Sequence, residues 1–202
     1  MINRNNGDYG IGGAIPFVAS PFNRVAQDGS RMAILESGFR SGAEGEARLV
    51  IRGALGDTLL SRAYPFTGKS IPRSEIDSAI QSQVRGHLSN PSSAPGFRQM
   101  VADLEKELTS RAPAYRSPFR TVQLGLDDTI WLRLSWGVSG DGYYLMLDGK
   151  GEPIATIKLP PRTVMMAANR EHMWTVQAGV DDLSSIVRYR IQGSQRSSSA
   201  YY

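Results

Sequence analysis

The residues of this chain that could carry chemistry are mostly carboxylates. Two adjacent pairs, Asp127–Asp128 and Asp181–Asp182, and two single residues, Asp141 and Asp148, all fall where turns are expected. Calcium needs about six to eight converging oxygens, and the sequence contains no D-x-[DN]-x-[DN]-G loop that would supply them. We therefore expect these aspartates to form turns. The alternative, an acidic metal site, would draw on Asp127, Asp141 and Asp148 together.

Other reactive side chains are scarce. The chain has no cysteine, which excludes disulfides, thiolate nucleophiles and cysteine metal sites, and it has only two histidines, His87 and His172. We expect His172 at the surface or hydrogen-bonded, and His87 in solvent. Neither a G-x-S-x-G nucleophile turn nor a phosphate-binding G-x-x-x-x-G-K-[ST] loop occurs. The sequence therefore predicts no catalytic residue, no metal site and no cofactor.

The three tryptophans fall into two groups. Trp131 and Trp174 occur in matching contexts, Asp-Thr-Ile-Trp-Leu and Glu-His-Met-Trp-Thr, and we expect both to pack in the core. Trp136 lies beside Gly137 and outside this correspondence, so it is the better candidate for an exposed aromatic on a ligand face.

Composition indicates a globular protein and argues against a nucleic-acid partner and a membrane-spanning helix. The 202 residues are 41% hydrophobic and 21% charged, enough for one folded domain and at most two. The net charge of +4 comes from 19 Arg and 4 Lys, which form no block of like charge, so no nucleic-acid partner is expected. No apolar run approaches the roughly 18 residues that a membrane helix needs. The first six residues do not resemble a secretory signal.

An internal repeat organises the second half of the chain. Trp131 and Trp174 are 43 residues apart, and the segments that begin at Tyr143 and Ile186 have the same offset. A repeat of this length is typical of a β-propeller blade. Asp-Asp, Ser-Gly-Asp-Gly and Asp-Gly-Lys-Gly turns separate short apolar runs, which predicts β-hairpins. The expected strands are residues 121–125, 129–135, 143–148 and 153–159, followed by 163–168, 173–178 and 186–191 without a fourth.

The first half contains a weaker third copy and an insertion. Residues 48–53 and 56–62, followed by Pro65, mirror the hairpin that ends at Pro160, but about 52 extra residues lie between the two copies. Inside that surplus the apolar spacing becomes helical, with stripes at Ile76, Ile80, Val84, Leu88 and at Phe97, Met100, Val101, Leu104, Leu108. Pro72 suits a first helical turn, and Ser74-x-x-Asp77 resembles a capping box. We expect a two-helix insertion at residues 72–113, whose stripes either pack together or form a docking face.

The most specific segments are residues 61–72 (SRAYPFTGKSIP), 122–133 (VQLGLDDTIWLR) and 185–191 (SIVRYRI). With them the chain resembles the C-terminal half of bacterial six-bladed β-propeller proteins, which are distantly akin to NHL-type propellers. The resemblance implies an all-β fold: an incomplete propeller of about three to three and a half four-stranded blades, with the helical insertion between blades. The expected organisation is a flexible lead-in at residues 1–24, a propeller-like domain at 25–192 and a Ser-rich tail at 193–202.

This resemblance also shapes the functional expectation. A closed six-bladed ring would need roughly 260 residues, so an open series of blades would expose apolar sheet faces and strand edges. Either an upstream segment or another molecule would then cover them. We expect a non-enzymatic protein-interaction module, an accessory subunit of a larger extracytoplasmic (periplasmic) assembly, with membrane association as one form of that assembly. Candidate contacts are the open blade edges, the helical insertion and the termini. The alternatives are a sensor that binds a small molecule or carbohydrate in its channel, and a metal-dependent hydrolase or lactonase.

Overall fold

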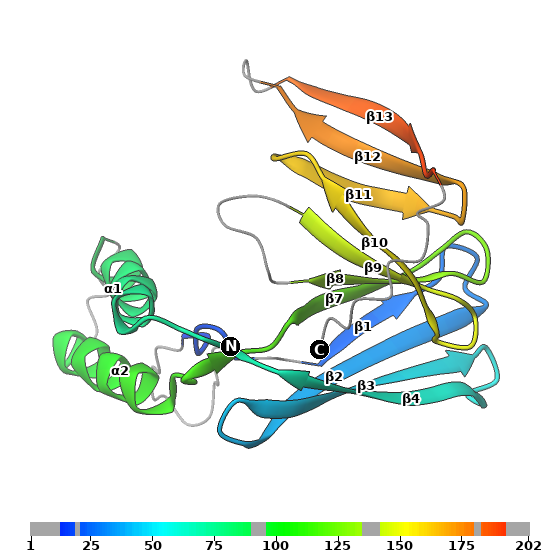
Figure 1. Ribbon diagram of the computed structural model, residues 1–202. Helices are drawn as coiled ribbons and strands as arrows, with labels where there is room; N and C mark the ends of the chain where they lie inside the picture. Colours follow the sequence, from blue (N-terminus) through cyan, green and yellow to red (C-terminus); the bar gives the residue numbers. More distant parts are fainter. Residues whose placement is uncertain (1–12, 19–20, 90–95, 135–141, 180–182, 193–202) are drawn as a thin grey trace. The chain divides into compact units, whose positions relative to one another are not determined.

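The computed structural model describes residues 13–18, 21–89, 96–134, 142–179 and 183–192. The chain divides into two compact units. Residues 1–18 and 69–116 form the helical unit, and residues 19–68 and 117–202 form the sheet unit. The fold is mostly β, in four antiparallel sheets with two helices, in agreement with the all-β class expected from the turn and strand pattern (Figure 1).

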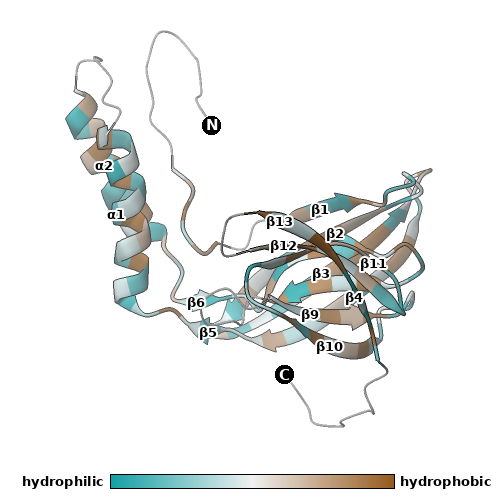
Figure 2. Cartoon of the chain, turned by 90° about the horizontal axis from the view of Figure 1, so that it is seen from above, coloured by the Kyte–Doolittle hydropathy of each residue, from teal (hydrophilic) through white to brown (hydrophobic). Residues whose placement is uncertain are grey.

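The helical unit is an antiparallel pair of amphipathic helices. Helix α1 (Arg73–Ser89) and helix α2 (Phe97–Arg111) both lie within the range that the period of apolar residues predicts, and apolar and polar segments alternate along them in Figure 2. The short strands β5 (Lys69–Ser70) and β6 (Tyr115–Arg116) pair where the unit begins and ends. The two apolar stripes form one buried cluster: Ile71, Ile76, Ile80, Val84, Phe97, Val101, Leu104 and Leu108.

This cluster confirms that the stripes pack together, with three differences from expectation. Leu88, in the last turn of α1, is 47% exposed and is not part of this cluster. His87, expected in solvent, is half-buried. At the helix start, Pro72 precedes α1 and its carbonyl accepts the Glu75 and Ile76 N–H groups, while Asp77 pairs with Arg73 instead of closing a capping box with Ser74.

Residues 14–17 of the expected lead-in pack in the helical unit. Ile15 and Phe17 pack against the apolar cluster of the helical unit, and the Gln83 side chain donates to the Ala14 carbonyl. The guanidinium of Arg116 lies over the Phe17 ring at 4.7 Å from its centroid. Residues 1–12 of the expected lead-in and the tail at 193–202 lie outside the described residues.

The sheet unit consists of three antiparallel sheets, each with its strands in chain order. Sheet 1 contains β1 (Phe22–Val25), β2 (Arg31–Ser41), β3 (Glu44–Gly53) and β4 (Thr58–Thr67). Sheet 2 contains β7 (Phe119–Leu124), β8 (Ile130–Leu134), β9 (Gly142–Leu147) and β10 (Pro153–Leu159). Sheet 3 contains β11 (Thr163–Ala168), β12 (His172–Ala178) and β13 (Ser184–Arg190).

The strand positions confirm the hairpin pattern of the second half. Strands β10 and β11 match their expected bounds, and the other five differ from expectation by one or two residues at either end. Sheet 3 has three strands in the part of the chain that the structure describes. The front copy is larger than expected, since two further strands, β1 and β2, precede the β3–β4 hairpin and complete a four-stranded sheet.

Side-chain alternation gives sheet 2 two apolar faces. One face presents Val122, Leu124, Ile130, Leu132 and Leu147, which join Ala33, Leu35, Leu49, Tyr64 and other sheet 1 residues in a buried cluster. The opposite face presents Trp131, Tyr144 and Met146, which are buried with Met165, Ala168 and Met173 of sheet 3. We call the face toward the preceding sheet the leading face, and the face toward the following sheet the trailing face. The three sheets are therefore stacked in order, trailing face on leading face.

Candidate functional site

The first strands of the three sheets meet around a hollow. Strands β1, β7 and β11 are each the leading edge of a sheet, and the Gln123 side chain of β7 donates to the Met166 carbonyl of β11 at 2.6 Å. Between them lies a cavity of about 280 Å³. The residues that line it are one arginine, three carboxamide residues and three apolar residues: Arg24, Asn23, Gln27, Gln123, Val25, Leu124 and Met166.

This lining is suited to holding a polar molecule. The Arg24 side chain is exposed and makes no ion pair or hydrogen bond to another described side chain or carbonyl. A guanidinium and carboxamides can together donate and accept hydrogen bonds from hydroxyl and carboxylate groups. Sequence reasoning did not find these residues, because they come from three segments that lie far apart in the chain.

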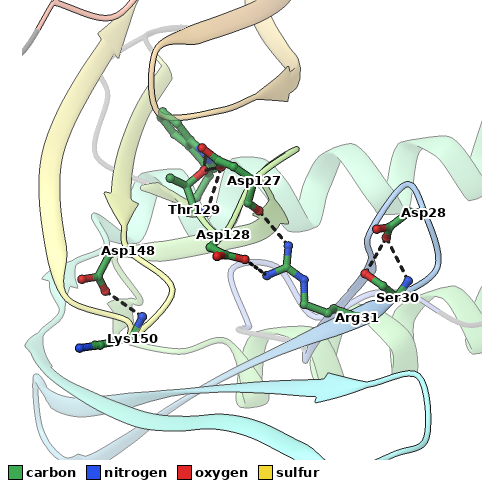
Figure 3. A network of polar contacts seen from close by, with 9 residues as sticks. Asp28, Ser30, Arg31, Asp127, Asp128, Thr129, Asp148 and Lys150 are labelled. Carbon is green, nitrogen blue, oxygen red and sulfur yellow. Dashed lines mark hydrogen bonds and ion pairs between the residues drawn. The ribbon is translucent and has the colours of Figure 1, made fainter.

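In each sheet, an Asx turn connects the first two strands. In sheet 1, Asp28 accepts hydrogen bonds from the Ser30 N–H at 3.0 Å and from the Ser30 hydroxyl at 2.7 Å. In sheet 2, Asp127 accepts the Thr129 N–H at 3.0 Å and the Thr129 hydroxyl (Figure 3). In sheet 3, the side-chain oxygen of Asn169 accepts the N–H groups of Glu171 and His172. These side chains replace backbone partners in tight turns, which is why Asp and Asn occur there.

The same turns tie neighbouring sheets together. The second carboxylate oxygen of Asp127 accepts the Arg170 N–H of the sheet 3 turn at 2.8 Å, 43 residues away. On the other side, Arg31 of sheet 1 pairs with the Asp128 carboxylate at 3.2 Å and donates to the Asp127 carbonyl at 2.8 Å (Figure 3). The expected turn role of Asp127 and Asp128 is confirmed, and it extends to holding the sheets together.

Asp148 has a similar role at the β9–β10 turn. Its carboxylate accepts the Lys150 N–H at 2.9 Å and the Glu152 N–H at 2.8 Å. The Glu152 N–H in particular lowers the pKa of Asp148, although partial burial opposes it. Asp148 is thus a turn residue, as expected. Asp141, Asp181 and Asp182 lie outside the described residues. In the described ranges, no three His, Cys, Asp or Glu side chains are grouped so that they could hold a metal ion.

The hydrogen bonds to the Asp127 carboxylate make its contribution to the stability of the fold depend on pH. Burial raises its pKa, but the Thr129 hydroxyl and the N–H groups of Arg170 and Thr129 outweigh burial, so the pKa lies below the ordinary 3.8. A carboxylate with a lowered pKa in the folded state stabilises the fold above its unfolded pKa, and this stability is lost as the pH falls through the folded value.

We therefore expect Asp127→Asn to be less stable than the wild type at neutral pH, with a difference that shrinks below a pH of about 4. Denaturant unfolding at a series of pH values between about 7 and 3 measures this. A difference that stays constant down to the lowest pH would contradict a contribution from the charge of Asp127.

The core position expected for Trp131 is confirmed, whereas Trp174 differs from expectation. Trp131 is fully buried between sheets 2 and 3, and its indole N–H donates to the Thr129 hydroxyl at 3.0 Å. Trp174 was expected in the core but is only half-buried, because it lies on the trailing face of sheet 3, where no further sheet packs within the described residues. His172 is half-buried beside it, with ring centroids 5.9 Å apart. Trp136 lies outside the described residues.

The trailing face of sheet 3 carries an open apolar row beside two exposed arginines, Arg188 and Arg190, which pair with Trp174 and His172. The paired residues Val164, Val176 and Ile186 form a row across all three strands, and Val164 is 49% and Ile186 80% exposed. Residues that pair directly across strands share one face of a sheet, and Trp174 is two residues from Val176 in β12, so this row lies on the same side as Trp174. Exposed apolar side chains gathered in one patch are typical of an interaction surface.

A scan against protein-family models, a search of curated proteins and a search of solved structures each gave no match. Among the described residues, no helix is both long enough and apolar enough to cross a membrane.

Proposed function

We propose that this chain is a non-enzymatic protein-interaction module of propeller type, in which the trailing face of sheet 3 docks a further β-sheet. In this proposal the three sheets are successive blades. The chain serves as an accessory subunit of a larger extracytoplasmic assembly, which can be membrane-associated, and this compartment rests on the family resemblance described above.

The order of the sheets supports the propeller proposal. In a propeller, each blade begins with an inner strand that faces a central channel, and consecutive blades pack face to face. Here β1, β7 and β11 are the first strands of their sheets and all contribute to the lining of the 280 Å³ hollow. The hydrogen bonds from Gln123 to Met166 and from Arg170 to Asp127 join sheets 2 and 3 across the 43-residue repeat.

The observation that carries the interaction function is the contrast between Trp131 and Trp174. The two residues occupy equivalent positions on the trailing faces of sheets 2 and 3. Sheet 3 covers Trp131 completely, whereas Trp174 and the row Val164–Val176–Ile186 are left open. Val164 and Val176 stand where the covered sheet, 43 residues earlier, has Thr121 and Arg133. These two positions are more apolar on the open face than on the covered one, whereas Arg188 pairs with Trp174 where Met146 pairs with Trp131. Covering the open face would therefore remove an apolar row from water beside an arginine.

A photo-cross-linking side chain placed at position 186 tests this proposal in the native cells. We expect one discrete adduct from position 186 and none from position 55, because Leu55 is 97% exposed but lies in the β3–β4 turn. Both substitutions are at exposed sites, so neither should impair folding. Absence of an adduct at position 186, or the same mixture of adducts from both positions, would overturn docking at this face.

The hollow favours a second candidate function, a module that binds a carbohydrate or another polar small molecule. Its guanidinium and carboxamides provide the hydrogen bonds that such a ligand needs. A thermal-shift screen with neutral sugars and sugar acids tests it. We expect a ligand that raises the melting temperature of the wild type but not of Arg24→Ala. If Arg24→Ala responds like the wild type, the site is not this hollow.

A further inference from the structure

The stacking of the sheets has a direction. The trailing face of sheet 1 meets the leading face of sheet 2, and the trailing face of sheet 2 meets the leading face of sheet 3. Both contacts are built from aliphatic and aromatic side chains of consecutive sheets. The structure thus contains two examples of one type of sheet-on-sheet contact, always trailing face on leading face.

Within the described residues of the sheet unit, one face of each type has no sheet against it. The open trailing face is that of sheet 3. The open leading face is that of sheet 1, where the paired residues Ile34 and Val50 are half-buried and Val25 is 57% exposed. Leu59 of β4 is 54% exposed and lies at a register shift, between Leu60, which packs against the buried cluster of sheets 1 and 2, and Thr58, which pairs with Arg52 on the leading face.

The two open faces are similar in chemistry and opposite in type. Each face has an apolar row beside exposed charged side chains. The trailing face presents Val164, Val176, Ile186 and Trp174 with Arg188 and Arg190, and the leading face presents Val25, Ile34, Val50 and Leu59 with Glu36, Arg48 and Arg52. One copy of the chain therefore carries both halves of the contact that already joins its own sheets twice. A second copy could therefore pack against the first in the same way, with a leading face on a trailing face.

We propose that a second copy of this chain packs the leading face of its sheet 1 onto the trailing face of sheet 3. This inference rests on the proposed interaction function and names the partner. The contact is heterologous, because the two copies use different surfaces. Such a contact closes into a ring if the rotation between copies allows it, and otherwise forms a chain. In a closed pair, each copy supplies three of six sheets.

Analytical ultracentrifugation of the full chain tests the proposal. We expect a wild-type species of twice the 22.1 kDa chain mass, or a concentration-dependent series of larger species. Ile186→Glu blocks the trailing face and Leu59→Glu blocks the leading face, and we expect each variant alone to be a monomer. Leu55→Glu, in the β3–β4 turn, is the matched control and should behave as the wild type.

Mixing the two face variants makes the test specific. Ile186→Glu keeps an intact leading face and Leu59→Glu keeps an intact trailing face, so an equimolar mixture should form one-to-one pairs. A wild type that is monomeric at all concentrations would overturn the proposal. So would a Leu59→Glu variant that still self-associates, because the contact would then join two sheet 3 faces. If the wild type is a monomer but position 186 cross-links to a different protein, only the second-copy proposal fails. If position 186 gives no adduct either, the proposed function fails as well.

Discussion

Replacing Trp131 by alanine is expected to lower the free energy of unfolding by about 3–5 kcal/mol, because the substitution opens a cavity in a packed core. Trp131 is fully buried between sheets 2 and 3, against residues such as Tyr144, Met146 and Met173. The variant also loses the hydrogen bond from the indole to the Thr129 hydroxyl, which itself donates to Asp127. Denaturant unfolding monitored by far-UV circular dichroism measures the loss.

Trp174→Ala is the matched control for this substitution. It removes the same side chain from the equivalent position of the next sheet, where the indole is only half-buried. We expect a loss of about 1 kcal/mol in dilute protein, since partly exposed side chains contribute less when truncated. Equal losses for the two variants would contradict the contrast between the covered and open trailing faces.

Gly151→Ala is the second substitution with a large expected effect, about 2–3 kcal/mol of lost stability. Gly151 has a φ of 77° in the β9–β10 turn, a conformation that strains an alanine. A Cβ there would also lie 2.7 Å from the Tyr64 hydroxyl oxygen and 3.0 Å from Cδ of Arg62. That hydroxyl donates to the Gly151 carbonyl at 2.8 Å, so the clash breaks a contact between sheets 1 and 2.

Two further variants separate the strain from the clash. Gly56 has a φ of 85° in the equivalent turn of sheet 1, and a Cβ added there would meet nothing within 4 Å. Gly56→Ala should therefore cost only the backbone strain, about 1 kcal/mol. In a Tyr64→Phe background, Gly151→Ala should lose less than in the wild type. If Gly151→Ala and Gly56→Ala destabilise equally, the Tyr64 contact does not limit this position.

Local signals were sufficient to predict the strands of sheets 2 and 3 and the two helices. The Asp-Gly-Lys-Gly turn at residues 148–151 and the Asp127–Asp128 turn mark hairpins whose strands pair with their chain neighbours. The four-residue spacing of Ile76, Ile80 and Val84 marks the buried side of α1. In each case a few adjacent residues carry the information, because the contacts that form the element are short-range.

Strands β1 and β2 were missed for a physical reason. Met32 and Ile34 are apolar on one face of sheet 1, and Ala33 and Leu35 are apolar on the other, so the strand lacks the alternation of a half-buried sheet. The Asp28–Gly29 turn before it was the available signal. The hollow could not be predicted, since its lining comes from three segments of the chain that meet only when the sheets stack.

The pairing of β5 with β6 bears on how well the fold tolerates insertions and deletions in the helical segment. Lys69 and Arg116 lie opposite each other in that pair, so the two ends of the segment that contains both helices are adjacent in space. The β5–β6 pair therefore closes this long loop within the helical unit, and its entropic cost is offset by contacts of that unit. Segments whose ends meet in this way are the ones that evolution and protein engineers can exchange, lengthen or remove with the least disturbance to the surrounding fold.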